Sequence, residues 1–248
     1  MHFIWGVSFA TLNHLVPRGI FLPIMTGLSS AILAGELVRY RKGFEWVNSL
    51  LYFLMGKALR KQEMDGKFTG AFYYLSGVTF TSYMFPNPCA TLGILQLAVA
   101  DPTASAFGRA TRHIYWSRIG NGLFGIGRNK GILGFLGGAI CCVPMNYRLI
   151  SLALAKKSAG VVAETIGKKT VLLISLALGA AGALADLMVP TPALTLPKKV
   201  CGVPVPPFHV DDNVAIPILS AWACVHIFKV AGFPIPPAEL TLAKYLVV

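Results

Sequence analysis

The sequence predicts an all-α fold: a polytopic integral membrane helix bundle with about six to seven transmembrane helices and one interfacial amphipathic helix. Of the 248 residues, 55% are hydrophobic and only 13% are charged, whereas soluble domains have about 25% charged residues. Several apolar runs approach the roughly 20 residues that a helix needs to cross a hydrocarbon core. Basic residues gather in the short connections between these runs, as they do on the cytoplasmic side of membrane proteins.

The expected spans follow one another along the chain as apolar runs. They cover residues 19–38, 69–85, 89–107, 131–147, 171–189 and 213–232, and residues 2–16 are a candidate seventh. The N-terminal stretch lacks a basic n-region and a convincing small-residue cleavage site, so we expect it to stay in the mature chain. Residues 44–59 have apolar side chains at helical spacing and basic residues towards their end, which indicates a helix lying in the interface. We expect residues 1–248 to form a single membrane-embedded domain.

Three polar segments are expected on one face of the membrane. Residues 39–67 and 108–130 are rich in lysine and arginine, and the positive-inside rule puts both in the cytoplasm. Two spans separate these segments, and two more bring residues 190–212 back to the same side. The same count puts the basic residues of segment 148–169 on the far side. Either residues 149–166 form an interfacial helix, or the count misses a crossing.

Composition and motifs exclude several classes of protein. The five cysteines form no C-x-x-C pair and four lie in or beside apolar runs, so neither a zinc site nor a disulfide framework is indicated. The net charge of +12 resides in short connections rather than on one soluble face, so we expect anionic lipid headgroups and a phosphorylated substrate as partners, and no nucleic acid. Residues 120–125 match G-x-G-x-x-G, but membrane spans rather than a βαβ unit flank them, which excludes a dinucleotide fold.

Aspartates at the ends of apolar runs are the first candidates for chemistry. Asp101 lies among small residues near the end of the run 89–107, and an acidic side chain at such depth indicates a functional site. The small side chains of Ala104, Ala106 and Gly108 would allow a neighbouring backbone or a ligand to approach closely. The structural alternative is that the small residues serve helix packing alone and that Asp101 pairs with a nearby cation, Arg109 or Lys130.

A second acidic element, Asp211-Asp212-Asn213, stands directly before the last apolar run. Two adjacent ionised carboxylates repel each other unless a cation or hydrogen-bond donors compensate, so the pair suggests a metal site or a reacting hydroxyl. The alternative is that Asp212 caps a helix that starts near Asn213. The residues alone leave both interpretations open.

Two basic elements are candidates for binding phosphate. The glycine-rich stretch 120–134 can expose amide hydrogens as an anion cradle, with Arg128 and Lys130 supplying charge. Arg60 and Lys61 follow the interfacial helix and could hold phosphate oxygens in the same way. A glycine-rich turn between helices would look the same as the cradle, and charges in such positions are usually solvated or lipid-facing.

Taken in chain order, these elements resemble the CTP-dependent lipid kinases of the endoplasmic reticulum membrane, a family that includes diacylglycerol, dolichol and phytol kinases. The matching elements are GELVRYR (35–41), LRKQE (59–63) with TGAFYYLSG (69–77), ADPTASAFGR (100–109), RNKGILG (128–134), LADLM (184–188) and VDDNVAIPILS (210–220). The last element agrees best with the diacylglycerol branch. Leu133 stands where polyprenol kinases tend to have a glutamate.

This resemblance implies transfer of the γ-phosphoryl group of CTP to the hydroxyl of a membrane lipid, with diacylglycerol giving phosphatidate and CDP. It implies catalytic roles for Asp101, Asp212 and Asn213, and a Mg²⁺ (or Ca²⁺ or Mn²⁺) site at Asp101, Asp211 and Asp212. The residues implied to bind the phosphates of CTP are Arg60, Lys61, Arg109, Arg128 and Lys130. The implied location is the endoplasmic reticulum or nuclear envelope, with the active site facing the cytoplasm.

Two other functions stay open at this point. One keeps the chemistry and changes the acceptor to a polyprenol such as dolichol, or to phytol. The other is a lipid or ion transporter, in which Asp101, Asp186 and Asp212 would be intramembrane coupling carboxylates. The oligomeric state does not follow from the sequence.

Overall fold

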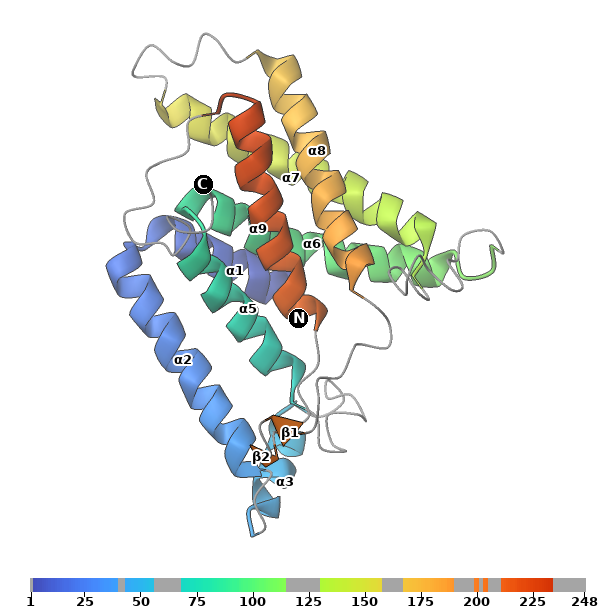
Figure 1. Cartoon of the computed structure of the whole chain (residues 1–248). Coiled ribbons are helices and arrows are strands. Elements are labelled where there is room, and N and C mark those ends of the chain that lie inside the picture. Colours follow the sequence, from blue (N-terminus) through green and yellow to red (C-terminus); the bar gives the residue numbers. More distant parts are fainter. Residues whose placement is uncertain are drawn as a thin grey trace.

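The computed structural model describes residues 2–39, 43–55, 68–114, 130–157, 167–189, 199–200, 203–204 and 211–233. Within these ranges the chain is a bundle of helices (Figure 1) with one short antiparallel hairpin. The elements are α1 (His2–Leu15), α2 (Arg18–Arg39), α3 (Glu45–Met55), α5 (Gly70–Met84), α6 (Asn87–Ala110), α7 (Ile132–Lys157), α8 (Lys168–Met188), β1 (Lys199–Val200), β2 (Val203–Pro204) and α9 (Asp212–Val230). The predicted all-α class is confirmed.

Four of the described helices are long and apolar enough to cross a membrane: α2, α7 over Ile132–Leu152, α8 and α9. Every predicted run forms a helix, but the predicted number of six to seven spans is not confirmed. Helix α5 has 15 residues and α1 has 14, both short of the roughly 20 that a span needs. The apolar helices nevertheless indicate a membrane protein.

Helix α6 is long enough to span, with 24 residues, but it lies at the centre of the bundle, in contact with α1, α5, α7, α8 and α9. Each residue from 89 to 100 is buried. The neighbouring helices satisfy its polar side chains: Gln96 Nε2 donates to the carbonyl of Leu178 at 2.8 Å, and Thr91 Oγ1 accepts from Asn13 Nδ2 at 2.9 Å. Because protein rather than lipid surrounds α6, it carries polar residues that a lipid-facing span would exclude.

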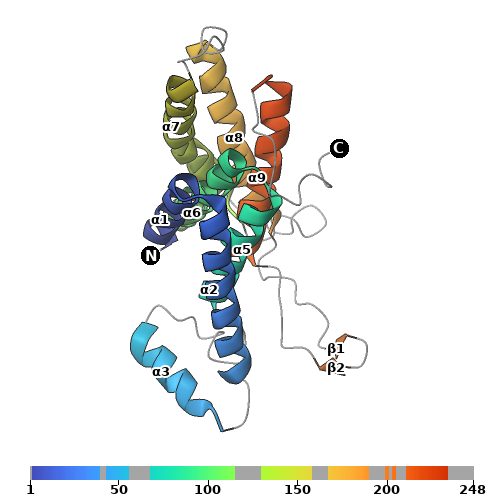
Figure 2. The ribbon, with the colours of Figure 1, turned by 90° about the vertical axis from the view of Figure 1, so that its left-hand side faces the viewer.

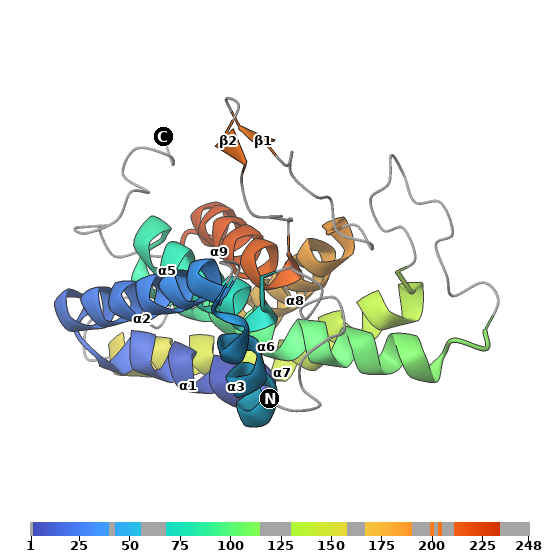
Figure 3. The ribbon, with the colours of Figure 1, turned by 90° about the horizontal axis from the view of Figure 1, so that it is seen from below.

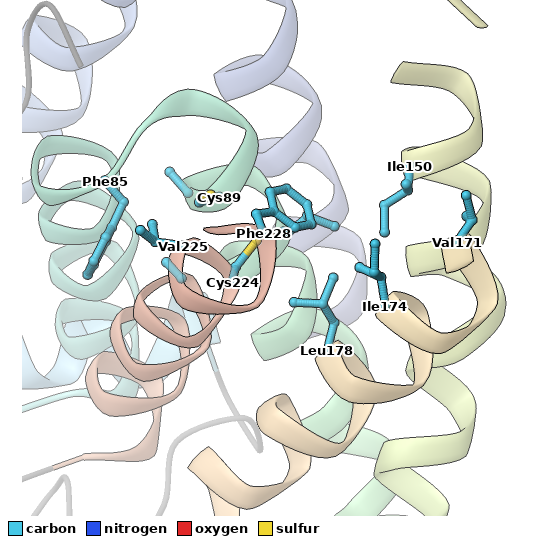
Figure 4. Packing of buried hydrophobic residues seen from close by; sticks show 12 residues of the cluster. Phe85, Cys89, Ile150, Val171, Ile174, Leu178, Cys224, Val225 and Phe228 are labelled. Carbon is cyan, nitrogen blue, oxygen red and sulfur yellow. The ribbon is translucent and has the colours of Figure 1, made fainter. Parts of the chain in front are cut away.

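Helices α8 and α9 pack antiparallel, and this packing determines where their ends meet. Figure 4 shows the apolar cluster in which Ile174 and Leu178 of α8 lie near Cys224 and Phe228 of α9. Because lipid rather than water surrounds two candidate spans, close van der Waals packing of these side chains is the main favourable term for the contact. As a result, the end of α8 and the start of α9 lie side by side, as the view from below shows (Figure 3).

The helix ends that border two of the three predicted polar segments, 39–67 and 190–212, lie on one side of the bundle. Helices α2 and α8 end on the same side of the bundle on which α5 and α9 begin (Figure 1). Residues 149–157 continue α7, so the prediction of a separate interfacial helix is wrong for this part of the segment, and residues 158–166 lie outside the described ranges. Ile150 is buried against Val171 and Ile174 of α8, and this apolar contact favours continuation of the helix.

The predicted amphipathic helix is present as α3, which lies away from the other helices at the foot of α2 (Figure 2). Trp46, Leu50 and Phe53 are 60%, 46% and 84% exposed. Their spacing places them on one face of the helix. An exposed apolar face of this kind fits a helix that lies in the membrane interface.

Labelling of introduced cysteines tests this arrangement. We expect Phe44→Cys and Arg112→Cys, in a cysteine-free background, to react with an impermeant thiol reagent from one side of sealed vesicles. Lys229→Cys, at the other end of α9, should react only from the opposite side because α9 has the length and composition of a span. All three native side chains are exposed. Reaction of all three from the same side would show that α9 does not cross.

Candidate functional site

Close packing between α6 and α7 positions Asp101. A Cβ added at Gly134 would lie 2.7 Å from the carbonyl oxygen of Ala104 and 3.5 Å from Cα of Gly108, so only glycine permits the two backbones to approach this closely. Ala104 is buried in this contact and Ala106 is exposed. Ala104 and Gly108 therefore serve helix packing, as the structural alternative proposed for them, whereas Ala106 takes no part in this contact.

The start of α9 is fixed by Asp211, which caps the helix. Asp211 Oδ1 accepts from the backbone N of Asn213 at 3.0 Å and from its Nδ2 at 2.7 Å. The expectation that Asp212 would be the cap is wrong, because the helix begins one residue earlier and Asp212 is its first residue. Asp212 Oδ1 also accepts from the backbone N of Asn213 at 3.0 Å. The two adjacent aspartates thus differ in position: Asp211 is the capping residue, and Asp212 is the first residue of the helix.

The spacing from Asn213 to Pro217 also has a structural explanation. Pro217 lacks the amide hydrogen that would bond the carbonyl of Asn213, four residues earlier in α9. That carbonyl faces Gly77 of α5, where an added Cβ would collide with the Asn213 oxygen. Proline and glycine together therefore let α5 contact the first turn of α9, next to Asp212.

Substitution of Gly77 tests this contact. We expect Gly77→Ala to destabilise the protein by about 1–3 kcal/mol, the usual cost of overpacking, measured as thermal unfolding in detergent. Gly35→Ala is the matched control, because an added Cβ there meets no atom within 4 Å. It should be neutral or stabilising by about 0.5–1 kcal/mol, the usual gain from replacing a helical glycine. Equal stability of the two variants would contradict a tight contact at Gly77.

The end of α8 and the start of α9 bring two carboxylates to a third, which lies within α6. Asp101 of α6, Asp186 of α8 and Asp212 of α9 each offer an oxygen, and these oxygens all lie within 4.8 Å of one another. Lys130, just before α7, forms an ion pair with Asp186, with Nζ 2.8 Å from Oδ1. The two side chains are 18% and 9% exposed, so water screens the pair only partly. The negative charges of Asp101 and Asp211 disfavour the ionised form of Asp212, and the positive charge of Lys130 favours it.

This arrangement fits a divalent cation. Three carboxylates at such short separation repel one another, and one ammonium group offsets only part of their charge. An all-oxygen donor set suits a hard cation, and Mg²⁺ commonly takes one or two protein carboxylates while substrate phosphates and water complete its coordination. The site can therefore hold a metal ion together with a phosphorylated ligand.

One curated protein is similar to this chain over most of its length. The chain is 27% identical over 203 residues to the CTP-dependent diacylglycerol kinase 1 of Schizosaccharomyces pombe. The aligned region covers 81% of this chain and 74% of the relative. The resemblance to CTP-dependent lipid kinases is confirmed. The relative is an enzyme by its name. No family model matches the chain, and no solved structure does.

The structure brings together only some of the predicted site residues. Asp101, Asp212 and Lys130 lie at one place, with Asn213 and Asp211 beside them at the start of α9. Arg109 is exposed in the last turn of α6, eight residues and about 12 Å along the helix axis from Asp101. Arg60, Lys61 and Arg128 lie outside the described ranges.

Asp186 is the member of the group that the predicted kinase site lacked. The element LADLM was matched to the lipid kinases, but no role in the kinase site was predicted for its aspartate. Asp186 was named only in the transporter alternative, as a coupling carboxylate. The signal that could have identified it is the one that identified Asp101, an acidic residue near the end of an apolar run.

Proposed function

We propose that this protein transfers the γ-phosphoryl group of CTP to the hydroxyl of diacylglycerol, giving phosphatidate and CDP. The observation that carries the proposal is the group formed by Asp101 of α6 and Lys130 with Asp186 and Asp212, which lie at the ends of two candidate spans. Phosphoryl transfer depends mainly on positioning and on neutralisation of phosphate charge, which such a group can provide. The similarity to a CTP-dependent diacylglycerol kinase supports CTP as the donor and a lipid as the acceptor.

In this proposal Asp186 and one or both of Asp101 and Asp212 hold Mg²⁺. The bound cation would neutralise charge on the phosphates of CTP. We assign Asp186 rather than Asp211 to the ligand set, because Asp186 lies within the group and Asp211 already accepts two hydrogen bonds as the cap. Asp211 and Asn213 then hold the first turn of α9, and thereby Asp212, in place.

Lys130 is proposed to hold both a carboxylate and a phosphate. An ammonium group has three donors, and in the structure Nζ of Lys130 contacts Oδ1 of Asp186 at 2.8 Å. A second donor can bond a phosphate oxygen of CTP without breaking that ion pair. Arg60, Lys61, Arg109 and Arg128 remain proposed phosphate ligands on the strength of the sequence resemblance.

The reaction needs an acceptor for one proton. The lipid hydroxyl oxygen forms a bond to the γ-phosphorus, the bond from that phosphorus to the bridging oxygen breaks, and CDP leaves. The hydroxyl proton passes to Asp101 or Asp212, two carboxylates of the group. Carboxylates at helix ends can meet a lipid hydroxyl at the interface and a nucleotide from water. The sequence resemblance supports a location on the cytoplasmic face of the endoplasmic reticulum or nuclear envelope.

An acceptor screen tests the proposal. Purified protein is incubated with γ-labelled CTP or ATP, Mg²⁺ and, separately, diacylglycerol, dolichol or phytol. We expect label in phosphatidate, from CTP in preference to ATP. Label in dolichyl or phytyl phosphate would keep the chemistry and change the acceptor. Absence of label in every lipid, from folded protein, would reject the kinase proposal and favour a transporter.

A further inference from the structure

A second feature lies on the lipid-facing side of α7 and α8. A groove of about 800 Å³ runs between these two helices, with an apolar floor and a cluster of cations. Its lining residues are Ile140, Val143, Pro144, Tyr147, Arg148, Lys168, Lys169, Leu172 and Leu176. Ile140 and Leu176 are 66% and 47% exposed, although both helices are candidate membrane spans. The apolar part of the groove therefore opens towards lipid.

The cations of the groove lie far from the carboxylate group. Lys168 begins α8, whereas Asp186 lies near its end. Eighteen residues separate them, which corresponds to about 27 Å along a helix. Because α8 is a candidate span, its two ends lie at opposite faces of the membrane. Arg148, Lys168 and Lys169 are therefore not available to the phosphates of CTP.

Within the described residues, the start of α8 carries an excess of positive charge. Lys168 and Lys169 occupy its first turn, where the helix dipole disfavours positive charge. The first turn contains no acidic residue, and the capping residue, Gly167, makes no side-chain hydrogen bond to the helix. Arg148 of α7 adds a third positive charge at the same end of the groove. An anion bound here would complement both the side chains and the helix terminus.

We propose that this groove binds an anionic phospholipid of the leaflet opposite the carboxylate group. One acyl chain lies along Ile140, Leu172 and Leu176, and the phosphate of the headgroup is held by Arg148, Lys168 and Lys169. The volume of the groove falls within the range of about 300–1,000 Å³ typical of small-molecule sites. A second copy of the chain is the poorer occupant, since a two-fold contact across the groove would bring its cations close to their own copies.

Spin-labelled lipids test the proposal. The protein is placed in phosphatidylcholine bilayers with a trace of chain-labelled phosphatidylglycerol or chain-labelled phosphatidylcholine, and the immobilised fraction of each is measured by electron paramagnetic resonance. We expect the protein to immobilise more phosphatidylglycerol than phosphatidylcholine. Arg148→Gln and Lys168→Gln each remove one charge, and each should reduce this preference about fivefold. Leu176→Trp, or Ile140→Trp if the first variant misfolds, should reduce the immobilised phosphatidylglycerol by filling the groove while the cations remain.

Lys229→Gln is the matched control, because Lys229 is an exposed cation at the same end of the bundle that does not line the groove. It should leave the preference unchanged. An equal loss in Lys229→Gln would show a general effect of surface charge and overturn the proposal. Unchanged binding in both tryptophan variants would overturn it as well, as would efficient disulfide formation between copies carrying Leu176→Cys.

Discussion

Replacement of Asp212 by asparagine is expected to reduce phosphoryl transfer from CTP by at least about a hundredfold, the low end for loss of an acid–base group. The substitution removes one carboxylate of the group formed with Asp101 and Asp186. An asparagine side chain can still accept the hydrogen bond that Asp212 Oδ1 receives from the backbone N of Asn213. The start of α9, and with it expression and membrane insertion, should therefore be preserved while the chemistry is lost.

The measurement is the turnover number with γ-labelled CTP and diacylglycerol in mixed micelles, at several concentrations of Mg²⁺. Asp211→Asn is the matched control, since its amide oxygen can keep the cap and Asp211 lies outside the carboxylate group. It should retain far more activity than Asp212→Asn. Retention of more than about a tenth of the activity by Asp212→Asn, a change in barrier under about 1.4 kcal/mol, would show that Asp212 has no catalytic role.

Mg²⁺ dependence separates the two roles that Asp101 and Asp212 can have. A variant that has lost a metal ligand should regain part of its activity at high Mg²⁺, because a higher concentration compensates for a weaker site. A variant that has lost the proton acceptor should stay inactive at every concentration. Asp101→Asn and Asp212→Asn compared in one titration thus show which carboxylate accepts the proton.

The structure explains why Asp101 and Asp212 could be predicted as candidates and Asp186 could not be placed with them. The first two stand in short elements of unusual sequence, an Asp-Pro within an apolar run and an Asp-Asp-Asn before one. Asp186 reaches them only through the register of α8 against α6. That register is set by the contact between Gly182 and Gln96, where an added Cβ would collide with the side-chain oxygen of Gln96. A contact between residues so distant along the chain leaves no local signal.

The apolar runs predicted the helices correctly, but they could not predict how many of these helices span the membrane. A long apolar run predicts a helix that either protein or lipid covers, and each of the six runs forms a helix. The run does not say whether protein or lipid covers the helix. Helix α6 is covered by protein over residues 89–100, and it carries Thr91 and Gln96 there because neighbouring helices supply their hydrogen-bond partners.

The ion pair between Lys130 and Asp186 leads to the second large expected effect. Lys130→Glu should reduce phosphoryl transfer by about a hundredfold to a thousandfold. It leaves Asp186 without its partner and adds a negative charge beside three carboxylates. Loss of one partner of a buried charge pair typically costs about 2–5 kcal/mol, and each 1.36 kcal/mol corresponds to a factor of ten in rate. Lys130→Gln removes the charge without reversing it and should lose less.

The double variant Lys130→Gln with Asp186→Asn shows what Lys130 does. If Lys130 only holds Asp186 in place, the double variant should be no less active than Asp186→Asn alone, because the lysine then has nothing left to orient. If Lys130 also binds CTP, the Lys130→Gln change should raise the KM for CTP in both backgrounds, while Asp186→Asn alone raises the Mg²⁺ requirement. We expect the second pattern, since the ammonium group has donors beyond the one that contacts Asp186. An unchanged KM for CTP in Lys130→Gln would restrict Lys130 to positioning Asp186 and leave CTP binding to the arginines and Lys61.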